Sequence, residues 1–199
     1  MTKEFAKAVS ERRSIYTLSK ESTVSDERIQ EIVHEAVKHT PSAFNSRSSR
    51  VVILFGEQHN KLWDITTEIL KTIVPADKFE STQQRMDGFR GAYGTVLYFE
   101  DQAVIEELQA KLPTYQDRFP VWSQQSSGML QFVIWTALEA EGLGANLQHY
   151  NPLIDERVKA EWGLPETWQL IAQMPFGTPT APPGEKEFGP VEERIQVFK

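Results

Sequence analysis

Three short apolar runs constrain the fold of this chain more than any other feature. They span 51–55 (VVILF), 95–99 (TVLYF) and 170–176 (LIAQMPF), and turn-forming residues bound the first of them. Runs of this length, rich in β-branched and aromatic residues, predict buried β-strands. The long stretches between them carry apolar residues at helical spacing. The sequence therefore predicts helices packed on one sheet, in an α/β or α+β sandwich.

The helical stretches differ in how clearly their ends are marked. The most regular spans 26–39, where Ser25 or Asp26 can cap its start and Pro41 must stop it. The longest, 121–142, is apolar on nearly every side, which predicts a central core helix or a subunit interface. Further helices are expected at 3–13, 57–73, 78–88, 101–111 and 152–163. A short strand is expected at 145–148, an exposed connector at 112–120, and a strand or tail at 192–198.

Composition excludes several classes of site. The chain has no cysteine, which rules out a disulfide framework, an iron–sulfur cluster and a thiol nucleophile. Its four histidines lack the spacing typical of a zinc site. A net charge of -7 argues against general nucleic-acid binding but leaves room for a local basic pocket. No apolar run approaches the roughly 18 residues of a membrane span, and the first residues lack the apolar core of a signal peptide, so we expect a cytoplasmic protein.

The length of 199 residues predicts one domain, 1–199. Its last part, from about 177 to 199, is rich in Pro and Gly and predicts an extended arm. Such an arm is hard to place inside a compact monomer. It favours a dimer in which the arm of one subunit reaches across the other.

Two motifs near the start could bind a ligand. Arg12, Arg13 and Ser14 offer two guanidiniums and a hydroxyl, which can clamp a phosphate. The alternative is that they only place cations at the C-terminus of a helix. The loop PSAFNS lies between a helix and a strand, where Ser42 and Asn45 can contact a flat heteroaromatic edge. The alternative there is an ordinary turn.

The second half of the chain holds further candidates. GLGAN, at 142–146, has small residues that allow a ligand ring to approach the backbone, or simply end the long helix. Lys186, with Arg194 as second choice, can close over a phosphate from the arm or remain solvated. Three aromatic residues can wall an aromatic substrate pocket or pack together: Tyr115, Phe119 and Trp122.

The order of these motifs resembles the nitroreductase family. The segments RRSIYTL, PSAFNSRSSRVVILFG, GFRGAYGTVLYFED and MPFGTPTAPPGEKEF, with the long apolar segment that ends in GLGAN, are similar to its compact branch, the fatty acid repression mutant-like nitroreductases. The resemblance covers nearly the whole chain. It implies an α+β fold, a three-layer α/β/α sandwich with a mainly antiparallel sheet and a C-terminal arm that crosses to the partner subunit.

The same resemblance implies a homodimer that binds FMN at the subunit interface. The positions that match cofactor-binding positions of the family are Arg12, Arg13, Ser14, Ser42, Asn45, Gln84, Leu143, Gly144 and Lys186. Arg12 and Ser14 are expected at the phosphate and ribityl chain, and the PSAFNS loop is expected to reach the flavin from the partner. Tyr16 stands where many members have a Lys or Arg near the flavin ring.

The activity implied is that of an FMN-dependent NAD(P)H oxidoreductase. The flavin accepts hydride at N5, the nicotinamide leaves, and a nitroaromatic or quinone-like acceptor takes its place; a role in oxidative-stress defence is a further expectation. No catalytic side chain is expected, because the flavin carries the chemistry. Two alternatives stay open: a flavin-binding regulatory protein in lipid or stress signalling with little turnover, and an unrelated α/β protein without a cofactor.

Overall fold

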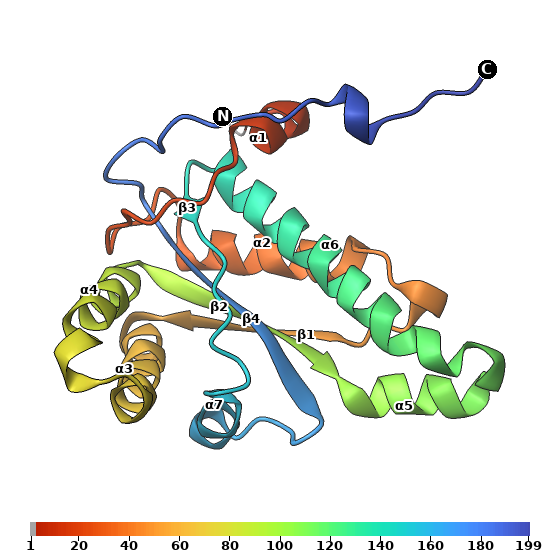
Figure 1. Ribbon diagram of the computed structural model, residues 1–199, viewed down its shortest axis with the longest axis horizontal. Coiled ribbons are helices and arrows are strands. Elements are labelled where there is room, and N and C mark those ends of the chain that lie inside the picture. Colours follow the sequence, from red (N-terminus) through yellow and green to blue (C-terminus); the bar gives the residue numbers. More distant parts are fainter. Residues whose placement is uncertain (1–2) are drawn as a thin grey trace.

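The computed structural model describes residues 3–199, which form seven α-helices and a four-stranded antiparallel sheet (Figure 1). The strands are β1 (Ser49–Phe55), β2 (Gly94–Asp101), β3 (Gly144–Ala145) and β4 (Trp168–Gly177), in the order β1-β2-β4-β3. The helices are α1 (Phe5–Glu11), α2 (Asp26–His39), α3 (Gly56–Ile73), α4 (Phe79–Arg90), α5 (Gln102–Lys111), α6 (Phe119–Ala140) and α7 (Asp155–Trp162). Within residues 3–199, no helix combines the length and apolar character needed to cross a bilayer.

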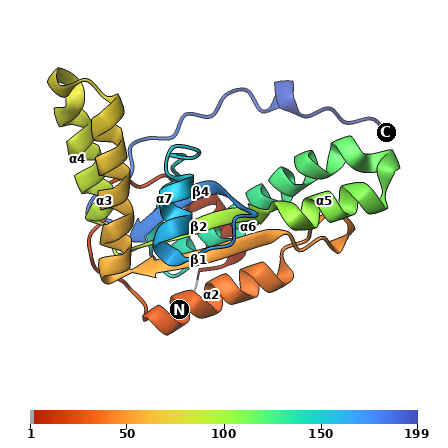
Figure 2. The ribbon, with the colours of Figure 1, turned by 90° about the horizontal axis from the view of Figure 1, so that it is seen from below.

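The sheet lies between two helical layers (Figures 1 and 2). Successive residues of β2 point to opposite faces, as in any strand. Val96 and Tyr98 join the core beneath α2 and α6, whereas Leu97 and Phe99 join the core beneath α3, α4 and α7. The sequence of β2 is a continuous apolar run because both faces of the strand are buried. The predicted α+β architecture is therefore confirmed.

Several element ends follow the local signals in the sequence. The Ser25 hydroxyl caps α2 and accepts a hydrogen bond from the Arg28 backbone N–H at 3.3 Å. Helix α2 stops at His39, just before Thr40 and Pro41, as predicted. Helix α7 ends at Trp162, and the next residue, Gly163, caps it in a left-handed conformation with φ of 60°. These boundaries depend on single residues, which is why the sequence alone could place them.

Other boundaries differ from the expectation. Helix α6 starts at Phe119 rather than at 121, because Pro120 is compatible with the first turn of a helix. The expected connector before it is mostly a 3-10 helix, Pro113–Arg118. The predicted strand 145–148 is only Gly144–Ala145, with one separate bridge at Gln148.

The short length of β3 has a backbone cause. The Asn146 N–H donates to the Pro175 carbonyl at 3.2 Å, but proline has no N–H to donate in return, so the ladder breaks there. Helix α1 is shorter than predicted and ends at Glu11, so that Arg12 and Arg13 lie beyond it. The final segment forms a 3-10 turn at Glu192–Arg194 and an exposed tail.

A buried polar network links α3 to the sheet. His59 Nδ1 lies 2.8 Å from the Thr95 hydroxyl, and Trp63 Nε1 donates to the same hydroxyl at 3.1 Å. His59 Nε2 lies 3.3 Å from the Arg90 carbonyl oxygen. Burial lowers the pKa of His59 to about 4, so that the ring is neutral in the folded protein at pH 7.

Acid is therefore expected to destabilise the protein through His59. Since the unfolded state binds this proton below pH 6.5 and the folded state only near pH 4, stability falls as pH drops through that window. The loss attributable to this ring is about 2–3 kcal/mol. Urea unfolding at pH 7 and pH 4.5 measures it, and the His59→Gln variant is expected to show a smaller pH dependence of the unfolding free energy than the wild type. Equal pH dependence in the wild type and His59→Gln would contradict the assignment.

Candidate functional site

The segment that follows α1, which contains Ser14, and the GLGAN segment lie side by side. The Ile15 backbone N–H donates to the Ala145 carbonyl oxygen at 2.9 Å, and Ser14 and Ala145 form a parallel bridge. The buried side-chain amide of Asn146 donates to the Ile15 carbonyl oxygen at 2.7 Å. The chain leaving α1 is thus joined to the end of the GLGAN segment, although more than a hundred residues separate them in sequence.

Gly144 makes this junction possible. A Cβ at this position would lie 2.9 Å from Pro179 Cγ and 3.0 Å from Ile15 Cβ, which is closer than side chains pack. The glycine therefore allows the chain after α1 and the start of the C-terminal arm to approach β3. Leu143 is fully buried in the core beneath α2 and α6. Of these two predicted cofactor residues, Leu143 directs its side chain into the core and Gly144 has none, so only their backbone is available to a ligand.

Cationic side chains gather at the same junction. The guanidinium carbon of Arg12 lies 4.3 Å from the centroid of the Trp135 ring on α6. Arg13 donates to the Glu185 carbonyl oxygen at 3.3 Å, which brings the arm, and with it Lys186, towards the first motif. Lys186 Nζ lies 5.1 Å from the centroid of the Phe188 ring. The structure therefore assembles the first motif, Gly144 and the arm near Lys186 from three distant parts of the chain.

The PSAFNS loop lies elsewhere, after the C-terminus of α2. Two of its residues, Phe44 and Asn45, adopt left-handed conformations with φ of 53° and 52°, and so does Arg47, which directly follows the loop, with φ of 51°. Such conformations are uncommon for bulky side chains and persist only where packing holds them. The Ser42 hydroxyl accepts a hydrogen bond from the Arg47 N–H at 3.0 Å.

Aromatic packing holds Phe44 in this conformation. Its ring centroid lies 5.7 Å from Tyr115, 5.5 Å from Phe119 and 5.8 Å from Trp122. Phe119 is buried, while Phe44 and Tyr115 keep exposed surface. Of the two alternatives for Tyr115, Phe119 and Trp122, mutual packing is what the structure shows.

A buried carboxylate that sequence reasoning missed anchors the start of β1, shortly after the PSAFNS loop. Glu100, near the end of β2, accepts hydrogen bonds from the hydroxyls of Ser48 and Ser49 at 2.6 and 2.5 Å. Burial raises its pKa, which the two serine hydroxyls partly offset. Glu100 lies in the run TVLYFED, where nothing in the sequence distinguishes a buried glutamate from an exposed one.

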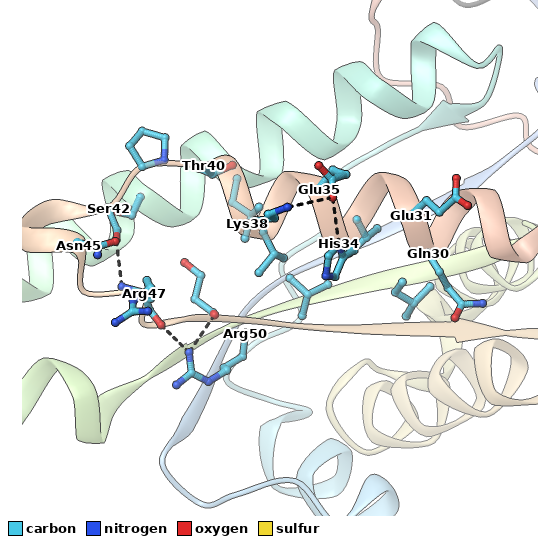
Figure 3. A pocket seen from close by; sticks show the side chains of 18 of the residues that line it. Gln30, Glu31, His34, Glu35, Lys38, Thr40, Ser42, Asn45, Arg47 and Arg50 are labelled. Atoms are coloured by element: carbon cyan, nitrogen blue, oxygen red, sulfur yellow. Dashed lines mark hydrogen bonds and ion pairs between the residues drawn. The ribbon is translucent and has the colours of Figure 1, made fainter.

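A groove of about 1220 Å³ runs along the outer edge of the sheet, between α2 and β1 (Figure 3). Its lining includes apolar residues of α2, β1 and α6: Val33, Val37, Val51, Ile53 and Leu130. Ser42, Asn45 and Arg50 lie on its polar rim, where Arg50 pairs with Asp101 at 3.0 Å. Because β1 is an edge strand, its outer side keeps unpaired backbone groups that can accept an additional strand.

The remaining predicted residues do not join the Arg12 junction within one chain. Gln84 is exposed on α4, which covers the opposite face of the sheet from α6. Across residues 3–199, neither Gln84, Ser42 nor Asn45 shares a hydrogen bond with Arg12, Arg13 or Ser14. Tyr16 is exposed beside the junction. The roles of Gln84, Ser42 and Asn45 toward a cofactor stay predictions.

Known proteins are similar to this chain over almost its full length. HBN1 of Saccharomyces cerevisiae is 40% identical over 198 residues, which cover 98% of this chain and 96% of HBN1. Nitroreductase FRM2 of the same yeast is 36% identical over 199 residues, which cover 99% of this chain and 98% of FRM2. Nitroreductase CinD from Lactococcus lactis, solved with nicotinic acid, is 48% identical with a TM-score of 0.92, covering 98% of this chain and 100% of CinD.

The family assignment follows from these similarities together with the fold. The model of the nitroreductase family matches residues 9–178, which include β1 to β4 and the junction between Ser14 and Ala145. The four-stranded antiparallel sheet between two helical layers is shared with CinD. The chain therefore belongs to the nitroreductase family and is an oxidoreductase.

Proposed function

We propose that this protein is an FMN-dependent NAD(P)H oxidoreductase that reduces small nitroaromatic or quinone-like acceptors. The observation that carries the proposal is the junction at which Arg12, Arg13 and Ser14 lie beside Gly144 and the C-terminal arm. Two guanidiniums and a hydroxyl suit a phosphate, and a segment ordered by Gly144 suits the close approach of a ring.

The solved relatives support the ligand classes. CinD has been solved with nicotinic acid, chloramphenicol and 4-nitrophenol, all small aromatic molecules. A nitroreductase from Desulfitobacterium hafniense, 18% identical with a TM-score of 0.70, carries bound FMN. The similarity to that protein concerns the fold, and FMN in this chain is part of our proposal.

The chain's own residues bind and orient rather than react. FMN, when bound, supplies hydride transfer from NAD(P)H to the acceptor. Arg12 and Ser14 would hold its phosphate and ribityl chain, with Arg13 and Lys186 adding positive charge. The Ile15–Ala145 hydrogen bond keeps the first motif in place while two flat substrates exchange. No side chain is assigned a proton-transfer role.

The subunit arrangement is the second part of the proposal. Helix α6 exposes Val121, Met129, Phe132 and Val133, which suits a face covered by another subunit. Every residue from 181 to 199 is exposed, and in Figure 1 the arm runs outward past α1 to the C-terminus. We propose a homodimer in which this arm crosses to the partner. Ser42 and Asn45, remote from Arg12 in their own chain, would then approach the flavin of the other subunit.

The apolar residues of the arm fit an edge strand. Ile195 and Val197 alternate with polar Gln196, so that an extended conformation would direct both apolar side chains to one side. The groove beside β1 offers an apolar floor and unpaired backbone groups on the partner. Extended segments add to open sheet edges through main-chain hydrogen bonds.

The absorption spectrum of the purified protein tests the cofactor and the activity together. We expect a visible flavin spectrum that bleaches when NADH or NADPH is added without oxygen and recovers on addition of a nitroaromatic or a quinone. A flavin that neither nucleotide reduces would overturn the reductase proposal and favour the alternative of a flavin-binding regulatory protein. A colourless protein that also fails to bind added FMN would overturn both. A cytoplasmic location and a role in oxidative stress stay predictions.

A further inference from the structure

The guanidinium of Arg12 is held by an aromatic ring rather than by a carboxylate. Its central carbon lies 4.3 Å from the centroid of the half-buried Trp135 ring, within the range of a cation–π interaction. In residues 3–199 no hydrogen bond or ion pair involves this guanidinium, and burial lowers its pKa. By contrast, Arg28, Arg50 and Arg90 each pair with a carboxylate.

Lys3 forms an ion pair with Glu139, the carboxylate that would otherwise be able to pair with Arg12. Glu139 lies one helical turn from Trp135 on α6, and its charge acts on Arg12. Lys3 Nζ binds Glu139 at 2.7 Å and also Glu11 at 3.0 Å. Both carboxylates are therefore engaged, and the N–H donors of Arg12 stay available to an anion from outside the chain.

We propose that Trp135 is a positioning residue for cofactor binding, which holds Arg12 so that its N–H fork meets the phosphate of FMN. This inference rests on the proposed FMN site. The planar guanidinium lies against the ring and is pre-organised, so less side-chain freedom is lost when a phosphate binds. Lys3 supports the same arrangement by keeping Glu139 away from Arg12.

The experiment compares FMN with riboflavin, which has the same ring and ribityl chain but no phosphate. Affinities of the apoprotein for both are measured by quenching of flavin fluorescence. Trp135→Leu is expected to weaken FMN binding by about fivefold and to leave riboflavin binding within about twofold, while Trp135→Phe stays within about twofold for both. A merely structural role would weaken both ligands together, which would overturn the inference, as would unchanged FMN binding.

Two further comparisons keep the test independent of how well Trp135→Leu folds. In the double variant with Arg12→Ala, Trp135→Leu is expected to add no further loss, because the ring acts through Arg12. Lys3→Met frees Glu139 to pair with Arg12 and is expected to weaken FMN binding selectively. The exposed neighbour change Lys7→Met is the matched control and leaves it unchanged. Additive losses in the double variant, or equal effects of Lys3→Met and Lys7→Met, would overturn the inference. A wild-type protein that binds riboflavin and FMN equally would instead overturn the phosphate site itself.

Discussion

Replacing Arg12 with alanine is expected to weaken FMN binding by about tenfold or more, since a hydrogen bond between charged groups is worth about 1.5–3 kcal/mol. The guanidinium lies over the Trp135 ring, and it makes no ion pair within residues 3–199. Removing it takes away a cation without freeing a buried carboxylate, so the fold itself is expected to tolerate the change. Titration of FMN into the apoprotein, followed by flavin fluorescence, measures the effect.

The matched control is Arg157→Ala, which removes the same charge from another face of the molecule. Arg157 pairs with Glu68 at 3.1 Å, and both side chains are exposed, so its loss costs little stability. FMN binding is expected to remain at the wild-type level in this variant. If Arg12→Ala bound FMN as tightly as Arg157→Ala does, the assignment of the first motif to the cofactor phosphate would be wrong.

Truncation before Pro182 is expected to convert the proposed dimer into a monomer and to lower its thermal stability. The deletion removes only exposed residues of the single chain, so a protein that functioned as a monomer would barely respond. In the proposed dimer, the same residues cover the groove beside β1 of the partner, and their loss exposes that groove. Sedimentation or light scattering measures the subunit number, and thermal unfolding measures the stability. A truncated protein that stayed dimeric and equally stable would remove the crossing arm from the proposal.

Single substitutions in the C-terminal arm test whether the arm binds the partner as an added β-strand or whether the dimer only needs the arm to be present. Ile195→Asp places a charge on the side that would face the apolar floor of the partner's groove. Gln196→Asp makes the same change in charge one residue further, where an extended chain points the other way. We expect Ile195→Asp to weaken the dimer and Gln196→Asp to leave it intact. Equal effects of the two would argue against an arm that binds as a strand.

Local signals account for what the sequence could predict. Ser25 caps α2 because its hydroxyl satisfies an N–H that the helix leaves unpaired, and Gly163 ends α7 because it adopts a left-handed conformation readily. The runs 51–55, 95–99 and 170–176 became strands because β-branched and aromatic side chains suit a sheet buried on both faces. Pro120 misled the prediction of where α6 begins, since proline suits both a connector and the first turn of a helix.

The sequence by itself determined the helices, the strands and the motifs that mark the family, because each depends on residues close together in the chain. Only the tertiary structure decided which motifs meet. In the folded protein, Ile15 is hydrogen-bonded to Ala145, and the Arg12 guanidinium lies over the Trp135 ring. The PSAFNS loop lies at the opposite end of α6. The tertiary structure also buries Glu100 under two serine hydroxyls and His59 beside Thr95. These contacts join residues that are far apart in sequence. They form only when the helical layers pack on the sheet, and a local pattern of side chains does not predict that packing.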